Sequence, residues 1–156
     1  MLYPNDIEAA ADSWSANCGP CALAALLEVP VNQVRDVLDG FDQRKYMNIT
    51  HMKNALDRCG IERHSLGKQL PQHGLAFIQW GGHEAKPHFV QYQFTHWIAV
   101  YPERSNVVDS WPYVFEVNAP RLVRFDEWQR QMSRISKGAG WGDGTYFVRA
   151  GIEVSF

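Results

Sequence analysis

The spacing of hydrophobic and polar positions changes about halfway along the chain. In the first part, apolar residues recur at the spacing of a helix that buries one face. The Ala- and Leu-rich run "CALAALLEV" is followed by Pro30, and two later stretches of this kind end at Gly40 and Gly60. Because Pro and Gly commonly end helices, the pattern predicts helices at about 18–29, 31–38 and 51–59.

The second part has residue patterns typical of β-strands. "FTHWIAVY" alternates and carries β-branched and aromatic residues, whereas "GLAFIQW" is a continuous apolar run typical of a buried strand. One stretch, at 124–132, is typical of a short helix instead. The expected strands are 74–80, 94–101, 105–111, 113–117 and 144–156. Helices followed by a mainly antiparallel sheet predict an α+β fold with the N-terminal helices packed on the sheet.

Composition narrows the class of protein. A chain of 156 residues, 46% of them hydrophobic, suits a single domain over 1–156. Its net charge of −2 provides no basic field for nucleic acid. The first residues show no signal-peptide pattern, and no apolar run is long enough to span a membrane. We therefore expect a cytoplasmic protein that neither binds nucleic acid nor inserts into a membrane.

The stretch Cys18-Gly19-Pro20-Cys21 is compatible with two alternative kinds of thiol chemistry. It opens the first predicted helix, with Asn17 as a suitable cap, and a helix N-terminus stabilises a thiolate. The same four residues form the redox motif of thioredoxin, which would use the two thiols as a reversible disulfide. That fold places its motif after a strand within a βαβ unit, and the residues before Cys18 have no strand character. The alternative is a cysteine hydrolase with Cys18 as nucleophile.

A hydrolase needs a general base and a group that orients it. His96 begins the strand-like run "HWIAVY", and Asp109 ends the next run. With a turn at about 102–105, these two positions face each other at one end of an antiparallel pair. Asp109 would then accept a hydrogen bond from one ring nitrogen of His96 and leave the other for the thiol.

These segments resemble a known family. "NCGPCALAALL", "ALDRCGI", "AFIQW" and "HWIAVYPERSNVVDSW" together resemble the bacteriocin-processing cysteine peptidases, which cleave double-glycine leaders, and their stand-alone relatives. The resemblance covers roughly residues 12–132. It implies a papain-like fold in which Cys18 is the nucleophile, His96 the base and Asp109 its orienting group. It also implies a peptide or protein substrate, and the mechanism needs neither a metal nor an organic cofactor.

The chain departs from that family at the oxyanion hole. The family usually carries a Gln a few residues before the nucleophile, and Asp12 occupies about that place here. An ionised carboxylate donates no hydrogen bond to an oxyanion. Asp12 is a candidate donor only in its protonated form, and Asn17, Ser13 or the indole of Trp14 are alternative donors beside the Cys18 backbone N–H.

Three functions therefore remain open. The first is a cysteine peptidase that works through an acyl-enzyme, with acyl transfer to an amine using the same residues. The second is a papain-like domain that binds a peptide without cutting it, and the third is a dithiol oxidoreductase. We expect the substrate to contact a group of aromatic residues, namely Trp14, Trp80 and Trp141.

Overall fold

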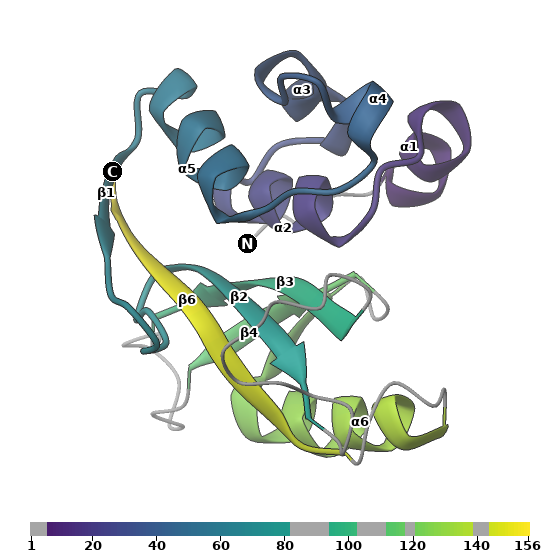
Figure 1. The fold of residues 1–156 in the computed structure, drawn as a ribbon, viewed down its shortest axis with the longest axis vertical. Coiled ribbons are helices and arrows are strands. Elements are labelled where there is room, and N and C mark those ends of the chain that lie inside the picture. Colours follow the sequence, from purple (N-terminus) through teal and green to yellow (C-terminus); the bar gives the residue numbers. More distant parts are fainter. Residues whose placement is uncertain (1–5, 82–93, 103–111, 118–120, 139–143) are drawn as a thin grey trace.

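The computed structural model describes residues 6–81, 94–102, 112–117, 121–138 and 144–156. The described chain forms a helical layer, a sheet and one further helix, α6, on the opposite face of the sheet (Figure 1). This α+β layout is the predicted one and is consistent with a papain-like arrangement. No helix among the described residues is long and apolar enough to cross a membrane.

The helical layer is built around α2, Cys18–Leu27. Asn17 caps this helix as predicted, because its side chain accepts a hydrogen bond from the Gly19 N–H at 3.3 Å. The helix is buried on nearly all sides, which fits its Ala- and Leu-rich sequence. Around it lie α1, Ile7–Trp14; α3, Val31–Val34; the 3₁₀ turn η1, Arg35–Val37; α4, Phe41–Arg44; and α5, Ile49–Arg58.

The sheet has six strands in the order β1-β6-β2-β3-β4-β5, and all neighbours are antiparallel. Alternate residues of its central strands face the two sides. Trp97 and Ala99 belong to the core beneath α2, whereas Ile98 and Val100 belong to a second core that contains Trp128 of α6, Phe125–Gly138. The strands are β1, Glu62–Ser65; β2, Gly74–Trp80; β3, Thr95–Tyr101; β4, Tyr113–Glu116; β5, Arg121–Arg124; and β6, Tyr146–Ser155.

Several local expectations need correction. The stretch 31–38 is divided into α3 and η1, and α5 begins earlier than expected because Asn48, with His51 as its capping-box partner, supplies the cap. The helices α1 and α4 and the strands β1 and β5 were not anticipated, since each is short or has weak apolar periodicity. The expected strand 105–111 lies outside the described residues, and β3 pairs on that side with β4.

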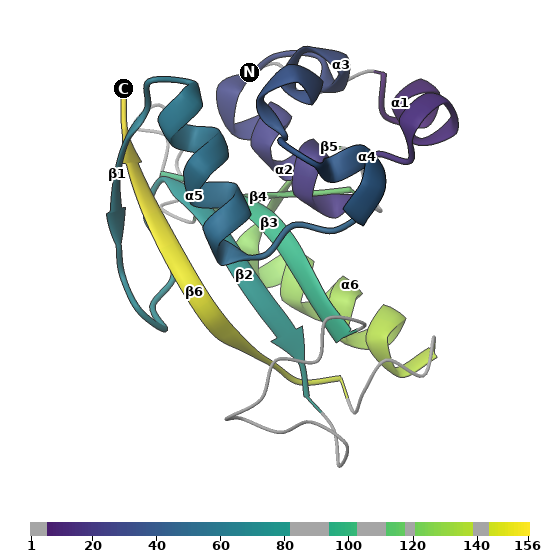
Figure 2. The ribbon, with the colours of Figure 1, turned by 45° about the horizontal axis from the view of Figure 1, so that its top comes forward.

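The helical layer and the sheet converge along β3 (Figure 2). Tyr101 near the end of β3 donates its hydroxyl to the Ala25 carbonyl of α2. At the other end of α2, Met47 packs so closely on Gly19 that an added Cβ there would lie 2.9 Å from the Met47 sulfur. These contacts fix the N-terminus of α2 against the start of β3, which is where the chemistry-bearing residues lie.

The approach of β2 to β6 depends on Gly74. A Cβ at this position would lie 1.8 Å from the Ile152 carbonyl oxygen, and the nearest atoms that it would meet are all backbone atoms of β6, which cannot rotate away. We predict that Gly74→Ala lowers the free energy of unfolding by about 3 kcal/mol in a urea titration. Gly60→Ala is the control, since it has open space and a φ of +71°, and should cost only about 1 kcal/mol. Equal losses would contradict the steric argument.

Candidate active site

Cys18 is the first residue of α2 and lies against β3. Its thiol is partly buried, which by itself would raise its pKa. The charge of His96, a hydrogen bond with that imidazole and the backbone N–H of Trp97 act in the opposite direction and outweigh burial and the weaker effect of Glu116. The pKa of Cys18 is therefore lowered, and its position at a helix N-terminus favours the same thiolate.

His96 is the second residue of β3 and is only 6% exposed. Its Nε2 lies 2.6 Å from one carboxylate oxygen of Glu116 and 2.8 Å from the other. Burial lowers the pKa of this imidazole, but the charges of Glu116 and Cys18 and the hydrogen bonds to both outweigh burial, so the pKa stands well above its ordinary value. Since Nε2 is occupied by Glu116, Nδ1 remains for the sulfur of Cys18.

Glu116 reaches His96 because of the register between β3 and β4. Phe115 pairs with Ala99, so Glu116 continues the ladder opposite Ile98, on the same strand face as His96. The side chain of Glu116 is fully buried, and one of its oxygens accepts the indole N–H of Trp128 at 2.9 Å. A line of contacts therefore runs from α2 through β3 and β4 to α6.

Trp80 covers this line of contacts. Its ring stacks near His96 with centroids 6.3 Å apart and lies 6.5 Å from the ring of Trp128. It is buried in the core between the sheet and α6. The structure thus gives Trp80 a shielding position beside the His96–Glu116 pair, in place of the expected contact with substrate.

Three other expected residues, all on α1, show no contact with Cys18 or His96 among the described interactions. Trp14 is buried against Phe41, and its indole N–H donates to Asn32 at 2.7 Å, so it is available neither to substrate nor to an oxyanion. Asp12 is exposed on α1 and forms no hydrogen bond or ion pair with the described residues. Ser13 is exposed on the same helix. Asp109 and Trp141 lie outside the described residues.

Asn17 is the expected oxyanion candidate that does lie beside Cys18. Its Oδ1 accepts the Gly19 N–H, and its Nδ2 donates to the Lys45 carbonyl at 2.8 Å, which leaves the second hydrogen of Nδ2 for another acceptor. The backbone N–H of Cys18 is among the first in α2, which have no acceptor within the helix. The Asn17 side-chain amide and the Cys18 backbone N–H are therefore the candidate donors to an oxyanion formed at the thiol.

A cavity of about 220 Å³ opens beside the thiol. Its lining combines apolar and polar residues, and its volume suits a single side chain of a peptide. The Trp97 indole donates to the Met47 carbonyl at 2.8 Å and thereby holds one wall in place. The lining residues are Asn17, Cys18, Lys45, Tyr46, Met47, Phe77, Thr95 and Trp97.

Sequence reasoning missed Glu116 and Trp128. A signal was present, because a carboxylate inside the apolar strand "YVFEV" must find a partner once it is buried. No sequence pattern predicted the cavity wall formed by residues 45–47. This segment follows the short helix α4 and belongs to no helix or strand itself. No group of three or more His, Cys, Asp or Glu within the described ranges is arranged to hold a metal ion.

No known protein family matches the chain, and no curated protein matches it in sequence. The resemblance to bacteriocin-processing peptidases therefore stays a prediction. The site is defined by its own geometry, in which a thiol, an imidazole and a carboxylate meet at the junction of the two layers.

Replacing Glu116 by Gln should change the titration of His96. The substitution removes the negative charge that most strongly raises the pKa of His96, and burial then has more weight. We predict that His96 loses its proton at lower pH in Glu116→Gln than in the wild type, measured by NMR on ¹³C-labelled imidazoles. His73, whose pKa is lowered mainly by burial, should titrate identically in both proteins. An unchanged His96 titration would contradict the prediction.

Replacing Trp128 by Phe should slow Cys18 through Glu116. The change keeps a buried ring but removes the N–H that fixes the carboxylate. Hydrogen bonds to charged groups contribute more free energy than hydrogen bonds between neutral groups. Because the lost bond goes to the Glu116 carboxylate, we expect the rate of iodoacetamide alkylation of Cys18 at pH 6 to fall about tenfold. Trp14→Phe also removes a buried indole hydrogen bond, and is the matched control that should leave the rate unchanged. Equal losses in the two variants would argue for a general effect of packing.

Proposed function

We propose that this protein is a cysteine hydrolase that cleaves a peptide or isopeptide bond. The observation that carries the proposal is the joining of Cys18, His96 and Glu116. A thiol with a lowered pKa contacts an imidazole with a raised pKa, and a buried carboxylate holds that imidazole through its far nitrogen. This is the arrangement of nucleophile, base and orienting group that acyl transfer requires.

The first half of the reaction follows from these positions. The Cys18 thiolate attacks the substrate carbonyl carbon, and the carbonyl electron pair moves onto the oxygen. The donors to that oxyanion are the backbone N–H of Cys18 and the side-chain N–H of Asn17 that is not bonded to Lys45. The C–N bond then breaks, and the imidazolium of His96 gives its Nδ1 proton to the departing amine. The product is an amine and a thioester on Cys18.

The second half uses the same groups in reverse. His96, now neutral, takes a proton from a water molecule as that water attacks the thioester carbonyl. The tetrahedral intermediate collapses, the carboxylic acid leaves, and the thiolate–imidazolium pair is restored. An amine in place of water would give acyl transfer by the same steps. Glu116 holds the imidazole throughout and stabilises the imidazolium through its direct contact with the ring.

The geometry favours this chemistry over a dithiol mechanism. Burial raises the pKa of Cys21 to about 12, so the second thiol of the motif is poorly suited to act as a thiolate. In the described residues before the motif, helix α1 occupies the place where a thioredoxin fold has a strand. A disulfide mechanism also gives the buried His96–Glu116 pair no role.

A peptide-binding domain without activity is the second candidate. It is favoured by one observation, the exposed Asp12 where related peptidases would carry a donor to the oxyanion. Losing one such donor typically costs roughly 10²–10³ in rate. The complete Cys18–His96–Glu116 contacts support the hydrolase, since a binding surface has no need of an activated thiol.

The ion pair is tested by alkylation with iodoacetamide and site-resolved mass spectrometry. At pH 6, Cys18 should react far faster than Cys21 and Cys59, because burial raises the pKa of both of those thiols. His96→Ala removes the groups that offset burial at Cys18, so its pKa should rise and the advantage should disappear. An advantage that survives His96→Ala would overturn the proposed pair.

Hydrolysis is tested with a proteome-derived peptide library, whose cleavage products are identified by mass spectrometry. The wild type should generate new peptide ends, and Cys18→Ala, which keeps the fold but lacks the sulfur, should generate none. Binding of peptides without new ends, combined with a reactive Cys18, would favour the binding domain. Oxidative linkage of Cys18 to Cys21 with no effect of His96→Ala would favour the dithiol oxidoreductase.

A further inference from the structure

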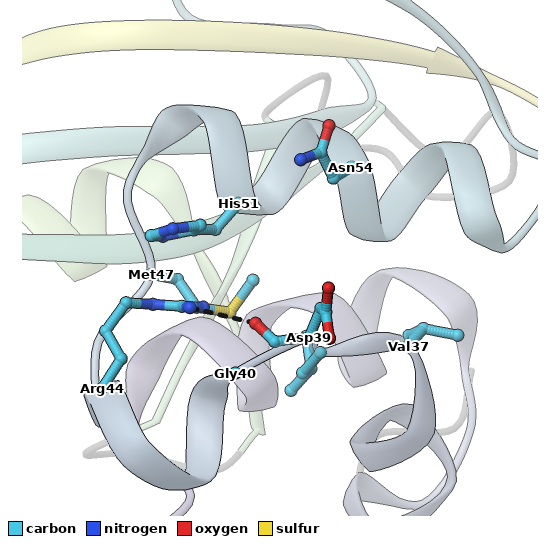
Figure 3. A pocket seen from close by; sticks show the side chains of 8 residues that line it. Val37, Asp39, Gly40, Arg44, Met47, His51 and Asn54 are labelled. Carbon is cyan, nitrogen blue, oxygen red and sulfur yellow. Dashed lines mark hydrogen bonds between the residues drawn. The ribbon is translucent and has the colours of Figure 1, made fainter.

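A second cavity, of about 310 Å³, lies behind the wall of the Cys18 cavity. Figure 3 shows it between α5, which contributes His51 and Asn54, and the segment from the end of η1 to Met47. Polar residues line it on both sides, with His51 and Asn54 on α5 and Asp39 and Arg44 on the facing segment. The lining residues are Val37, Leu38, Asp39, Gly40, Arg44, Met47, His51 and Asn54.

Arg44 places a fixed positive charge in this cavity. Its Nε donates to the Tyr46 carbonyl at 2.8 Å, and one Nη donates to the Asp39 carbonyl at 2.9 Å (Figure 3). The guanidinium also lies 5.6 Å from the centroid of the Tyr46 ring. Both hydrogen bonds go to neutral carbonyls, and no carboxylate of the described chain forms an ion pair with Arg44. Its second Nη is therefore free to donate, and its charge is not neutralised.

His51 and Asn54 add neutral donors on the facing helix. The Nδ1 of His51 accepts the Asn48 N–H at 3.1 Å, so the neutral ring carries its proton on Nε2. Burial and the charge of Arg44 lower the pKa of His51, which favours this neutral form. Asn54 follows one turn later on α5 and brings an exposed amide to the same cavity.

One acidic residue also lines the cavity. The carboxylate of Asp39 pairs with Arg58 at 3.1 Å, and its side chain is 82% exposed. Arg58 is not itself a lining residue, but its charge balances that of Asp39, so the charges of Asp39, Arg58 and Arg44 together sum to +1. The cavity therefore has a net positive character and several hydrogen-bond donors, which is the chemistry that receives a carboxylate.

The two cavities share a wall. Met47 lines both, and Tyr46, which lines the Cys18 cavity, contacts the Arg44 guanidinium and lies 6.0 Å from the His51 ring. The Asn17 side chain holds the Lys45 carbonyl, and Trp97 holds that of Met47. The two cavities are therefore neighbours, separated by the segment that carries Tyr46 and Met47.

We propose that the second cavity is an anion subsite that takes the carboxylate of an acidic side chain of the peptide bound at Cys18. The proposal rests on the proposed hydrolase function and gives it a substrate class. Arg44 would bind the carboxylate through its free Nη and the remaining hydrogen of the other Nη, with His51 Nε2–H and the Asn54 amide as further donors.

The preference is tested with the same peptide library on three proteins. Wild-type cleavage sites should be enriched in Asp or Glu at one fixed distance from the cut. In Arg44→Gln, kcat/KM for a Glu-containing peptide from that set should fall about tenfold, while its Gln-containing counterpart changes little. Arg63→Gln is the control, since Arg63 is on β1 and pairs with Asp57. Equal loss for the Glu and Gln peptides would overturn the subsite.

Alkylation of Cys18 separates the subsite from the catalytic centre. Arg44→Gln also removes two hydrogen bonds that shape the wall, so the rate of iodoacetamide alkylation at Cys18 is measured alongside. An unchanged rate together with loss of the acidic preference supports the subsite. A parallel fall of the alkylation rate and of both peptide rates would show that Arg44 acts by supporting the wall, and would overturn the proposal.

A binding measurement keeps the subsite testable without hydrolysis. The α-methylamides of N-acetyl-glutamate and N-acetyl-glutamine, which differ only in the side-chain carboxylate, and inorganic phosphate are titrated at constant ionic strength, and the ¹³C-labelled His51 imidazole is followed by NMR. We expect a saturable shift with the glutamate derivative alone, and its loss in Arg44→Gln. No saturable shift, or a stronger response to phosphate, would overturn the proposal. The expected shift without cleavage of any peptide would reject the hydrolase and retain the carboxylate site.

Discussion

The contact between His96 and Glu116 is the interaction on which the candidate site depends. Both side chains are buried, and an imidazolium or a carboxylate alone in that position would be strongly unfavourable. Together, at 2.6 Å, each supplies the charge that makes the other tolerable. The negative charge of Glu116 raises the pKa of His96 and so favours the protonated ring. The protonated ring in turn lowers the pKa of Cys18 and stabilises its thiolate.

That contact joins both layers of the fold. Glu116 is held from beneath the sheet by Trp128 of α6, whereas Cys18 comes from α2 above it. Trp80 covers the same region from the end of β2. Buried pairs of this kind contribute little net stability, because desolvation offsets much of their attraction. The contacts of Glu116 with His96 and Trp128, and of Trp80 with His96, therefore define the geometry of the pair more than they stabilise the fold.

The sequence was informative where chemistry depends on short-range structure. Cys18 at a capped helix start and His96 at a strand start follow from capping and from hydrophobic periodicity, and the structure brings these two residues together. The orienting group was not predictable in the same way. A turn assumed at 102–105 pointed to Asp109, which lies outside the described residues, whereas the observed register of β4 brings Glu116 to the ring.

Local sequence patterns predict the α+β class, the helix that presents Cys18 and the strand that presents His96, because periodicity and capping act over a few residues. The contact of Glu116 with the imidazole and the burial of Trp14 and Trp80 come from tertiary contacts alone. The same contacts leave Arg44 without a carboxylate partner among the described residues, in the cavity that shares Met47 with the Cys18 cavity. These outcomes depend on strand register and on contacts between segments far apart in the chain, which no local pattern encodes.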